Sequence, residues 1–188
     1  MLVLASRSPQ RRAILEQLGI AFTIAVPEVE ELDSGPAAEV TVENAYRKAE
    51  AVARRLAGRQ PTMPVLAVDT VVTLGARLYG KPAGAQAARE TLLALSGRRH
   101  AVVSGLCLIE GERARTAAST TLVDFRALDD ALLDWYLASG EWRERAGAYA
   151  IQGRGAALVE GIDGDYWNVV GLPVATLVAI RPGLLTGG

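Results

Sequence analysis

The sequence has very few of the side chains that hold soft metal ions or crosslink a chain. Of its 188 residues, one is a cysteine, Cys107, and one is a histidine, His100. A single cysteine excludes an intramolecular disulfide and a multi-cysteine zinc site. With one His and one Cys, a zinc site of the usual nitrogen and sulfur type is disfavoured as well. A metal ion would be held mainly by oxygen, which points to Mg²⁺ or Mn²⁺.

The chain also lacks an excess of positive charge and a long apolar run. Its 20 basic and 21 acidic residues give a net charge of −1, which disfavours binding to duplex nucleic acid through bulk electrostatics. The longest mostly apolar stretch, Val169 to Ile180, contains Gly171 and Pro173 and is too short to span a bilayer. No basic segment precedes an apolar one at the start of the chain. We therefore expect a cytoplasmic protein with neither a membrane nor a nucleic-acid partner.

The pattern of apolar residues indicates a mixed α/β protein. Half of the residues are apolar, and no repeat, low-complexity tract or linker is present, so residues 1–188 are predicted to form a single domain. A short apolar strand at residues 2–5 leads to a helix that begins at Ser8-Pro9 and ends at Gly19. The fold class predicted is α/β, with a mixed twisted sheet flanked by helices.

The rest of the chain continues in the same way. Strands are expected at 22–26, 65–72, 101–109 and 116–125, with a hairpin at 75–76. Helices are expected at 41–56, 83–95, 129–137 and 174–180. The glycine-rich stretch 146–173 is expected to form tight turns and short strands.

Only two of the 20 basic residues are lysines, Lys48 and Lys81, and the other 18 are arginines. A chain that otherwise uses Arg can keep Lys where a compact ammonium group is needed. Codon bias with two chance survivors explains the same count. Composition leaves both explanations open.

Two polar clusters could bind a phosphate-bearing ligand and its counter-ion. Free N–H groups at the start of the first helix suit an anion, and the turn before it adds hydroxyl and guanidinium donors. These donors come from Ser6, Arg7, Ser8, Arg11 and Arg12. The loop between Glu28 and Asp33 is acidic, and one of its carboxylates could reach a divalent cation. A capped helix with a solvated basic face and a solvated acidic loop are the alternatives.

Asp69 is the most informative single residue, because it lies in VLAVDTVVTL with apolar neighbours on both sides of the strand alternation. Burial of an unpaired carboxylate is costly, so Asp69 should form an ion pair, bind a metal or face a cleft. A structural ion pair is the alternative to a functional role. Gln152 stands among glycines where its amide could read a base edge. His100 and Cys107 are expected to be structural.

Eight motifs along nearly the whole chain resemble the Maf family of nucleoside triphosphate pyrophosphatases. They are LASRSPQRRAILEQLGI at 4–20, PEVEE at 27–31, ENAYRKA at 43–49, AVDTVV at 67–72, GKP at 80–82, LSGRRH at 95–100, AGAYAIQGRGA at 146–156 and IDGDYWNVVGLP at 162–173. The resemblance implies a fold related to inosine triphosphate pyrophosphatases, with a nucleotide cleft between two lobes. It also implies metal-dependent hydrolysis of a nucleoside triphosphate to the monophosphate and pyrophosphate.

Site residues follow from the same resemblance. Asp69 matches the family's proton acceptor, and Glu31 and Asp69 are implied to lie at the Mg²⁺ or Mn²⁺ ion. Lys48 and Lys81 match two lysines that face phosphate. The other matches are the phosphate-binding turn, Ser6, Ser8, Arg11 and Arg12, and two base-specificity positions, Thr70 and Gln152.

Gln10 departs from the family pattern, because the residue after Ser8-Pro9 is usually Arg in the dTTP/UTP branch and Trp in the 7-methyl-GTP branch. The expected substrates are dTTP, UTP or modified pyrimidine nucleotides, with 7-methyl-GTP as an alternative. A nucleotide-binding regulator of septum formation and cell division, without essential catalysis, is a further alternative. The resemblance also suggests a homodimer.

Overall fold

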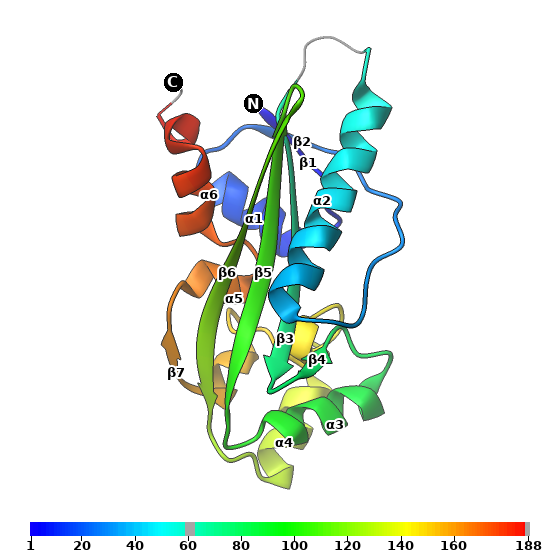
Figure 1. Ribbon diagram of the computed structural model, residues 1–188. Coiled ribbons are helices and arrows are strands. Elements are labelled where there is room, and N and C mark those ends of the chain that lie inside the picture. The colour runs from blue at the N-terminus through cyan, green and yellow to red at the C-terminus, as the bar shows by residue number, and fades with distance from the viewer. Residues whose placement is uncertain (59–62, 187–188) are drawn as a thin grey trace.

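A seven-stranded mixed sheet lies at the centre of the computed structural model, which describes residues 1–58 and 63–186 (Figure 1). The strands are β1 (Leu2–Leu4), β2 (Phe22–Ile24), β3 (Val65–Leu74), β4 (Arg77–Tyr79), β5 (Arg99–Glu110), β6 (Arg113–Phe125) and β7 (Val159–Asp163). Their order is β2-β1-β3-β5-β6-β7, and β4 pairs with β3. β1 runs parallel to β2 and β3, whereas the other pairs are antiparallel. The mixed sheet predicted from the sequence is confirmed.

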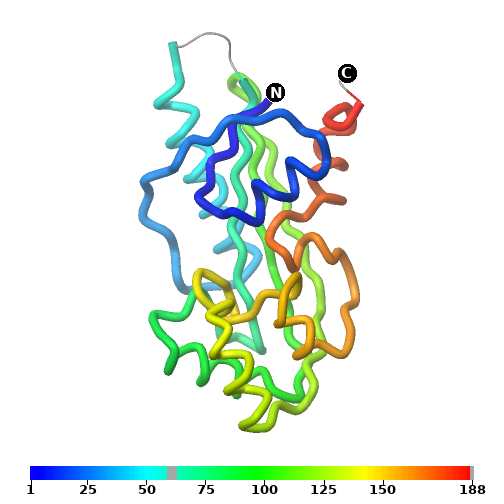
Figure 2. Tube along the Cα trace, turned by 180° about the vertical axis from the view of Figure 1, so that it is seen from behind, coloured from blue at the N-terminus to red at the C-terminus, as the bar shows by residue number. Residues whose placement is uncertain are grey.

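Helices cover both faces of the sheet and one of its ends. They are α1 (Pro9–Gln17), α2 (Ala37–Leu56), α3 (Ala85–Leu95), α4 (Asp130–Ala138), α5 (Tyr166–Val170) and α6 (Val174–Ile180), with short 3₁₀ turns η1 (Ala146–Ala148), η2 (Arg154–Leu158) and η3 (Pro182–Leu184). α2 lies in front of the sheet in Figure 1, and α1 lies in front in the view from behind in Figure 2, so they cover opposite faces. Among the described residues, no helix is long and apolar enough to cross a membrane.

Both faces of β3 are buried, because successive strand residues point to opposite sides and each side meets a helix. Ala67 packs in one core with Ala45 of α2. Leu66 and Val68 pack in another core with Ile14 of α1. A strand covered on both faces has a continuous apolar sequence, which explains the missing alternation in this segment.

A third core fills the end of the molecule where α3 and α4 lie. It joins Leu92 of α3 and Leu133 of α4 to Val72 and Val102 of the sheet, and it includes Tyr149 from the loop after η1. This core supports the segment 144–152, which forms part of the candidate site.

Gly105 allows α2 to lie unusually close to the sheet. It is the β5 partner of Asp69, so the two residues share one face of the sheet. A Cβ atom at Gly105 would overlap the backbone of Thr41 and Val42 in α2. The missing side chain therefore sets the distance between α2 and the strand that carries Asp69.

The main differences from the predicted elements lie at α2 and in the glycine-rich stretch. α2 begins at Ala37, four residues before the expected start, because its first turn follows Pro36 and contributes little to the apolar stripe. The stretch 146–173 contains one strand, β7, together with 3₁₀ turns and the short helix α5, instead of several short strands. The Asp165 side chain caps α5 by accepting a hydrogen bond from the backbone of Trp167.

Candidate active site

A gap in the strand pairing along one side of β3 creates the candidate site. β1 pairs with β3 at Val65 and Leu66, and β4 pairs with β3 from Val72 onward. Residues 67–71 thus have β5 on one side, and Asp69, Thr70 and Val71 among them line a cleft. The carboxyl end of the parallel strand β1 opens into the same cleft, which is the usual place for a ligand in parallel sheets.

The cleft has a volume of about 760 Å³, within the range of roughly 300–1,000 Å³ typical of small-molecule sites. One wall consists of residues from 5–11, the loop 27–33 and α2. The other wall includes residues 78–81 and 144–152. Because Asp69 and Thr70 are successive strand residues, they reach the cleft from opposite faces of the sheet.

Lys48 joins two carboxylates in the cleft. Its Nζ atom lies 2.7 Å from Oε2 of Glu31 and 2.7 Å from Oδ1 of Asp69. The side chains of Lys48 and Asp69 are 9% and 10% exposed, whereas that of Glu31 is 50% exposed. The buried pair is therefore fixed by the core, and Glu31 closes it from the solvent side.

Asn44 connects the acidic loop to this pair. Its Oδ1 accepts a hydrogen bond from the backbone N–H of Leu32 at 2.7 Å, and its Nδ2 donates to the Leu32 carbonyl at 2.9 Å and to Oδ2 of Asp69 at 3.1 Å. Asn44 was not among the site residues predicted from the sequence. Its spacing of four residues from Lys48 places both on one face of α2, and this is the signal that could have identified it.

The protonation of Asp69 reflects a balance of opposing effects. Burial raises the pKa of the Asp69 carboxyl, but the charge and hydrogen bond of Lys48 and the hydrogen bond of Asn44 hold that pKa below its ordinary value. Asp69 is consequently ionised at neutral pH, which suits a group that accepts a proton or binds a cation.

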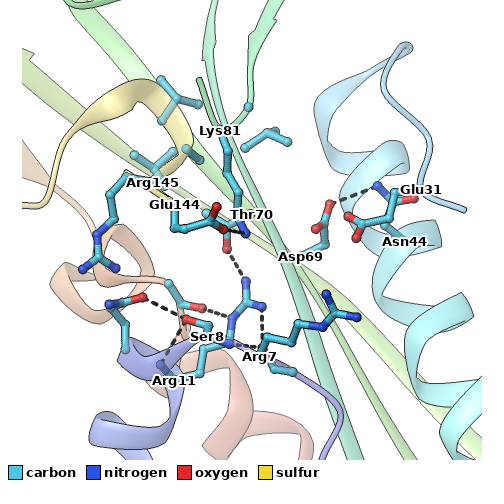
Figure 3. A pocket seen from close by; sticks show the side chains of 18 of the residues that line it. Arg7, Ser8, Arg11, Glu31, Asn44, Asp69, Thr70, Lys81, Glu144 and Arg145 are labelled. Atoms are coloured by element: carbon cyan, nitrogen blue, oxygen red, sulfur yellow. Dashed lines mark hydrogen bonds and ion pairs between the residues drawn. The ribbon is translucent and has the colours of Figure 1, made fainter. Parts of the chain in front are cut away.

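Arg11 lines the cleft, and its guanidinium group donates hydrogen bonds to oxygens of the protein (Figure 3). Its Nε donates to the Gly171 carbonyl at 2.8 Å, its Nη1 to Oγ of Ser6 at 3.1 Å and its Nη2 to Oγ1 of Thr70 at 3.1 Å. Burial lowers the pKa of Arg11, although Asp69 and the acidic loop oppose this. These contacts fix the positions of the Ser6 and Thr70 hydroxyls.

The hydroxyls at the start of α1 are also fixed. Ser6 Oγ accepts the backbone N–H of Ser8 at 3.1 Å. Ser8 caps the helix by accepting the N–H of Arg11, and its own hydroxyl donates to Oε1 of Gln10. Thr70 Oγ1 also lies 2.9 Å from Oγ of Ser104, so its hydroxyl has partners on both sides.

Lys81 enters the cleft from the opposite wall. Its Nζ lies 2.7 Å from Oε2 of Glu144, and the two side chains are 62% and 79% exposed. Gln152, Glu144 and Arg145 line the same wall. Glu144 and Arg145 were not predicted from the sequence, because no local pattern places the 144–152 loop opposite α1.

The structure brings ten of the predicted site residues together and separates one. The cleft-lining residues are Ser6, Ser8, Gln10, Arg11, Glu31, Lys48, Asp69, Thr70, Lys81 and Gln152. Arg12 is exposed on α1 and is not among the lining residues, so its role in the phosphate-binding turn stays a prediction. Successive helical residues point about 100° apart, and Arg11 takes the inward direction.

His100 and Cys107 lie outside the lining of the cleft and are buried. His100 Nε2 is 3.0 Å from the hydroxyl of Tyr149, and its ring meets Phe125 edge to face. Burial lowers the pKa of His100 to about 4 and raises the pKa of Cys107 to about 12. Both residues are therefore neutral in the folded protein at pH 7.

Comparison with known proteins identifies the family of this chain. Residues 1–181 match the family described as Maf-like protein. The chain belongs to the Maf-like protein family.

Several curated relatives of this Maf-like chain carry the name dTTP/UTP pyrophosphatase. The relative from Pyrococcus furiosus is 43% identical over 95% of this chain and 93% of its own length. The relative from Myxococcus xanthus is 47% identical over 98% and 93% of the two chains. The relative from Symbiobacterium thermophilum is 43% identical over 100% and 97%.

A solved structure, the Ham1 protein of Staphylococcus aureus, shows a weaker likeness. It shares 19% identity with a TM-score of 0.47, over 66% of this chain and 71% of its own. This value is too low to assign a fold by itself.

Proposed function

We propose that this Maf-like chain hydrolyses nucleoside triphosphates, with dTTP and UTP as the expected substrates, to the nucleoside monophosphate and pyrophosphate. The observation that carries the proposal is the buried Asp69–Lys48 pair, which faces a cleft large enough for a nucleotide. The names of relatives that are 43–47% identical over nearly their whole length support the substrate class.

The cleft has enough donors for a triphosphate despite the net charge of −1. Arg7, Lys48 and Lys81 line it, together with the hydroxyls of Ser6 and Ser8. A triphosphate carries about four negative charges, so a local concentration of cations is what binding requires. Both lysines of the chain lie at the cleft, which favours a functional reason for their retention over codon bias.

The donor set fits a hard divalent cation shared with the substrate. No group of three or more His, Cys, Asp or Glu side chains that could hold a metal exists among residues 1–58 and 63–186. Mg²⁺ commonly binds through one or two carboxylates, with phosphate oxygens and water completing its shell. Glu31 and Asp69 would hold Mg²⁺ or Mn²⁺ in this way. The ion would neutralise charge on the phosphates.

The other steps of the hydrolysis are assigned to side chains that line the cleft. Asp69 accepts a proton from the water that attacks the α-phosphate, and pyrophosphate leaves. Lys48 holds the Asp69 carboxylate, and Asn44 ties it to the acidic loop. Lys81 reaches the phosphates from the opposite wall once it exchanges Glu144 for a phosphate oxygen. Thr70 and Gln152 contact the base.

The test is the Asp69→Asn variant, assayed for pyrophosphate release from dTTP, UTP and 7-methyl-GTP with Mg²⁺. Removing a general base typically costs about 10²–10⁴-fold in rate, and we expect a loss of that size with dTTP and UTP. Asp163→Asn is the matched control, because Asp163 is exposed on β7 and does not line the cleft. Near-normal pyrophosphate release by Asp69→Asn would show that Asp69 does not have this role.

A nucleotide-binding regulator would give a different result. It would bind dTTP or UTP in the presence of a chelator and release no pyrophosphate when Mg²⁺ or Mn²⁺ is restored. The homodimer and the cytoplasmic location remain predictions.

A further inference from the structure

The two ends of the cleft differ in their chemistry. We define the Asp69 end as Glu31, Asn44, Lys48 and Asp69, and the Arg145 end as Glu144, Arg145, Tyr149 and Ile151. In Figure 3, Arg145 and Asp69 lie on opposite sides of Thr70 and Lys81. The Arg145 side chain extends from the 144–152 loop toward the turn that carries Ser8.

Within residues 1–58 and 63–186, the Arg145 guanidinium group has no hydrogen-bond or ion-pair partner, unlike three other cations that line the cleft. Lys48 and Lys81 are paired with carboxylates, and Arg11 donates to three protein oxygens. Among the described residues, no ion pair includes Arg145, and its buried Nε has no hydrogen-bond acceptor. Burial also lowers the pKa of Arg145. A buried guanidinium N–H without an acceptor is unfavourable. Among the described residues, neither Nη atom of Arg145 forms a hydrogen bond, so the Nη donors are available to a ligand oxygen in the cleft.

The loop holds Arg145 in place. Its backbone N–H donates to the Trp142 carbonyl at 3.3 Å, and its carbonyl accepts the N–H of Ala148 at 3.1 Å. The Tyr136 hydroxyl of α4 accepts the N–H of Ala150 at 3.0 Å. The guanidinium group is thus carried by a segment that is bonded to α4, which is the kind of support that a recognition residue needs.

The wall beside Arg145 suits a planar base. It is formed by members of the third core that also line the cleft, namely Val72, Val102, Ala146, Tyr149, Ile151 and Val169. Apolar walls with a few polar groups are typical of small-molecule sites. The phosphates, in contrast, require the cations and carboxylates of the Asp69 end.

We propose that Arg145 is a specificity-determining residue, whose guanidinium group donates a hydrogen bond to the O4 carbonyl of uracil or thymine. The inference rests on the proposed function. Uracil and thymine present an acceptor at this position, whereas cytosine presents an amino donor. Arginine can only donate, so a cytosine amino group would face a second donor. Arg145 thereby favours UTP and dTTP over CTP.

The experiment measures kcat/KM for UTP and CTP in the wild-type protein, in Arg145→Gln and in Arg145→Lys. A good base contact discriminates by a factor of about 5–150, and we expect the UTP/CTP ratio to fall about tenfold or more in Arg145→Gln. Arg145→Lys should lie between, because it keeps the charge but loses the planar fork. Arg143→Gln is the matched control, since Arg143 lies two residues before Arg145, stacks on Trp142 and does not line the cleft.

The outcomes separate this inference from the proposed function. An equal loss of kcat/KM for UTP and CTP would indicate a phosphate contact and would overturn the inference, as would an unchanged ratio in both Arg145 variants. Absence of turnover by the wild-type protein would contradict the proposed function alone. The ratio is then measured from the Kd values of UTP and CTP with a chelator present, where the same fall is expected. Thermal unfolding confirms that each variant is folded.

Discussion

The Asp69 end and the Arg145 end of the cleft satisfy their charges in opposite ways. At the Asp69 end, Lys48 is buried between two carboxylates, and Asn44 bonds both Asp69 and the loop backbone. At the Arg145 end, Glu144 forms an exposed pair with Lys81, and the Nε of Arg145 has no acceptor in the part of the chain that the structure describes.

This difference suits two roles. The Asp69 end holds its catalytic groups in place before the substrate binds, whereas the Arg145 end has donors that only a bound substrate satisfies. Electrostatic groups that are already in place need no rearrangement during a reaction. Polar groups without a hydrogen-bond partner in the free protein instead give substrate selectivity, because the wrong substrate leaves them without a hydrogen bond. The two lysines also differ in this way, because Lys48 is buried against Asp69 whereas Lys81 forms an exposed pair with Glu144.

Removing Lys48 should have the largest effect on stability. Lys48→Met leaves Asp69 buried and unpaired, and breaking a buried pair in this way costs about 3–5 kcal/mol. The free energy of unfolding in urea measures this loss. The same substitution at Lys81 is the control at the other end, and a similar loss there would contradict the contrast between the two lysines.

The core beneath the Arg145 end should respond to pH. His100 bonds Tyr149, and burial lowers the His100 pKa from 6.5 to about 4. Between these values the unfolded chain binds more protons, so stability rises with pH from about 4 to about 6.5 and is lost on acidification. The His100 contribution is on the order of 3 kcal/mol over this window.

The comparison between wild type and His100→Gln isolates the histidine from the carboxylates that titrate in the same range. The difference in unfolding free energy between the two proteins should change across the window. A difference that stays constant from pH 4 to pH 7 would show that His100 is not buried in its neutral form.

The geometry of the Asp69 end, and with it stability and activity, should also depend on Gly105. Gly105→Ala forces α2 away from β5, because the new Cβ overlaps the Thr41 and Val42 backbone. Overpacking of this kind costs about 1–3 kcal/mol, and it moves Asn44 and Lys48 away from Asp69, so pyrophosphate release should fall as well. Gly161→Ala is the control, since a Cβ atom at Gly161 would have an Asp124 oxygen as its nearest neighbour, at 3.9 Å. Full activity in Gly105→Ala would show that the approach of α2 is unimportant.

The smallest effect on stability is expected for the exposed pair. Glu144→Gln removes the partner of Lys81, and surface pairs contribute about 0–1 kcal/mol. The freed Lys81 should bind phosphate more easily, so KM for UTP should fall slightly. Chemical denaturation measures the free energy of unfolding, and steady-state kinetics measure KM. A stability loss above about 2 kcal/mol would show that this exposed pair contributes as much as a buried pair and would contradict the contrast.

The site could be predicted from the sequence where burial makes a residue unusual. Asp69 is conspicuous because β3 is covered on both faces, so its other residues are mostly apolar and a carboxylate stands out among them. Lys48 and Lys81 are conspicuous because lysine is rare in this chain. The strand–turn–helix at the start was predicted because Ser8, Pro9 and Gly19 act locally on the backbone.

The rest depends on contacts between distant segments. Arg11 and Arg12 are adjacent and chemically identical, and only the packing of α1 against Gly171 and Thr70 decides which one points inward. Arg145 lies in a loop that is bonded to α4 through Ala150 and Tyr136, and no local pattern describes this long-range contact. α5 has five residues, too few to show a helical period.

The central claim is that the Asp69 end directs water to the α-phosphate. The direct test is hydrolysis of UTP by the wild-type protein in water enriched in heavy oxygen, with the products separated by mass. We expect the label to appear in the monophosphate and pyrophosphate to remain unlabelled, because water attacks the α-phosphate. Label in pyrophosphate, or release of a single phosphate with UDP, would contradict it.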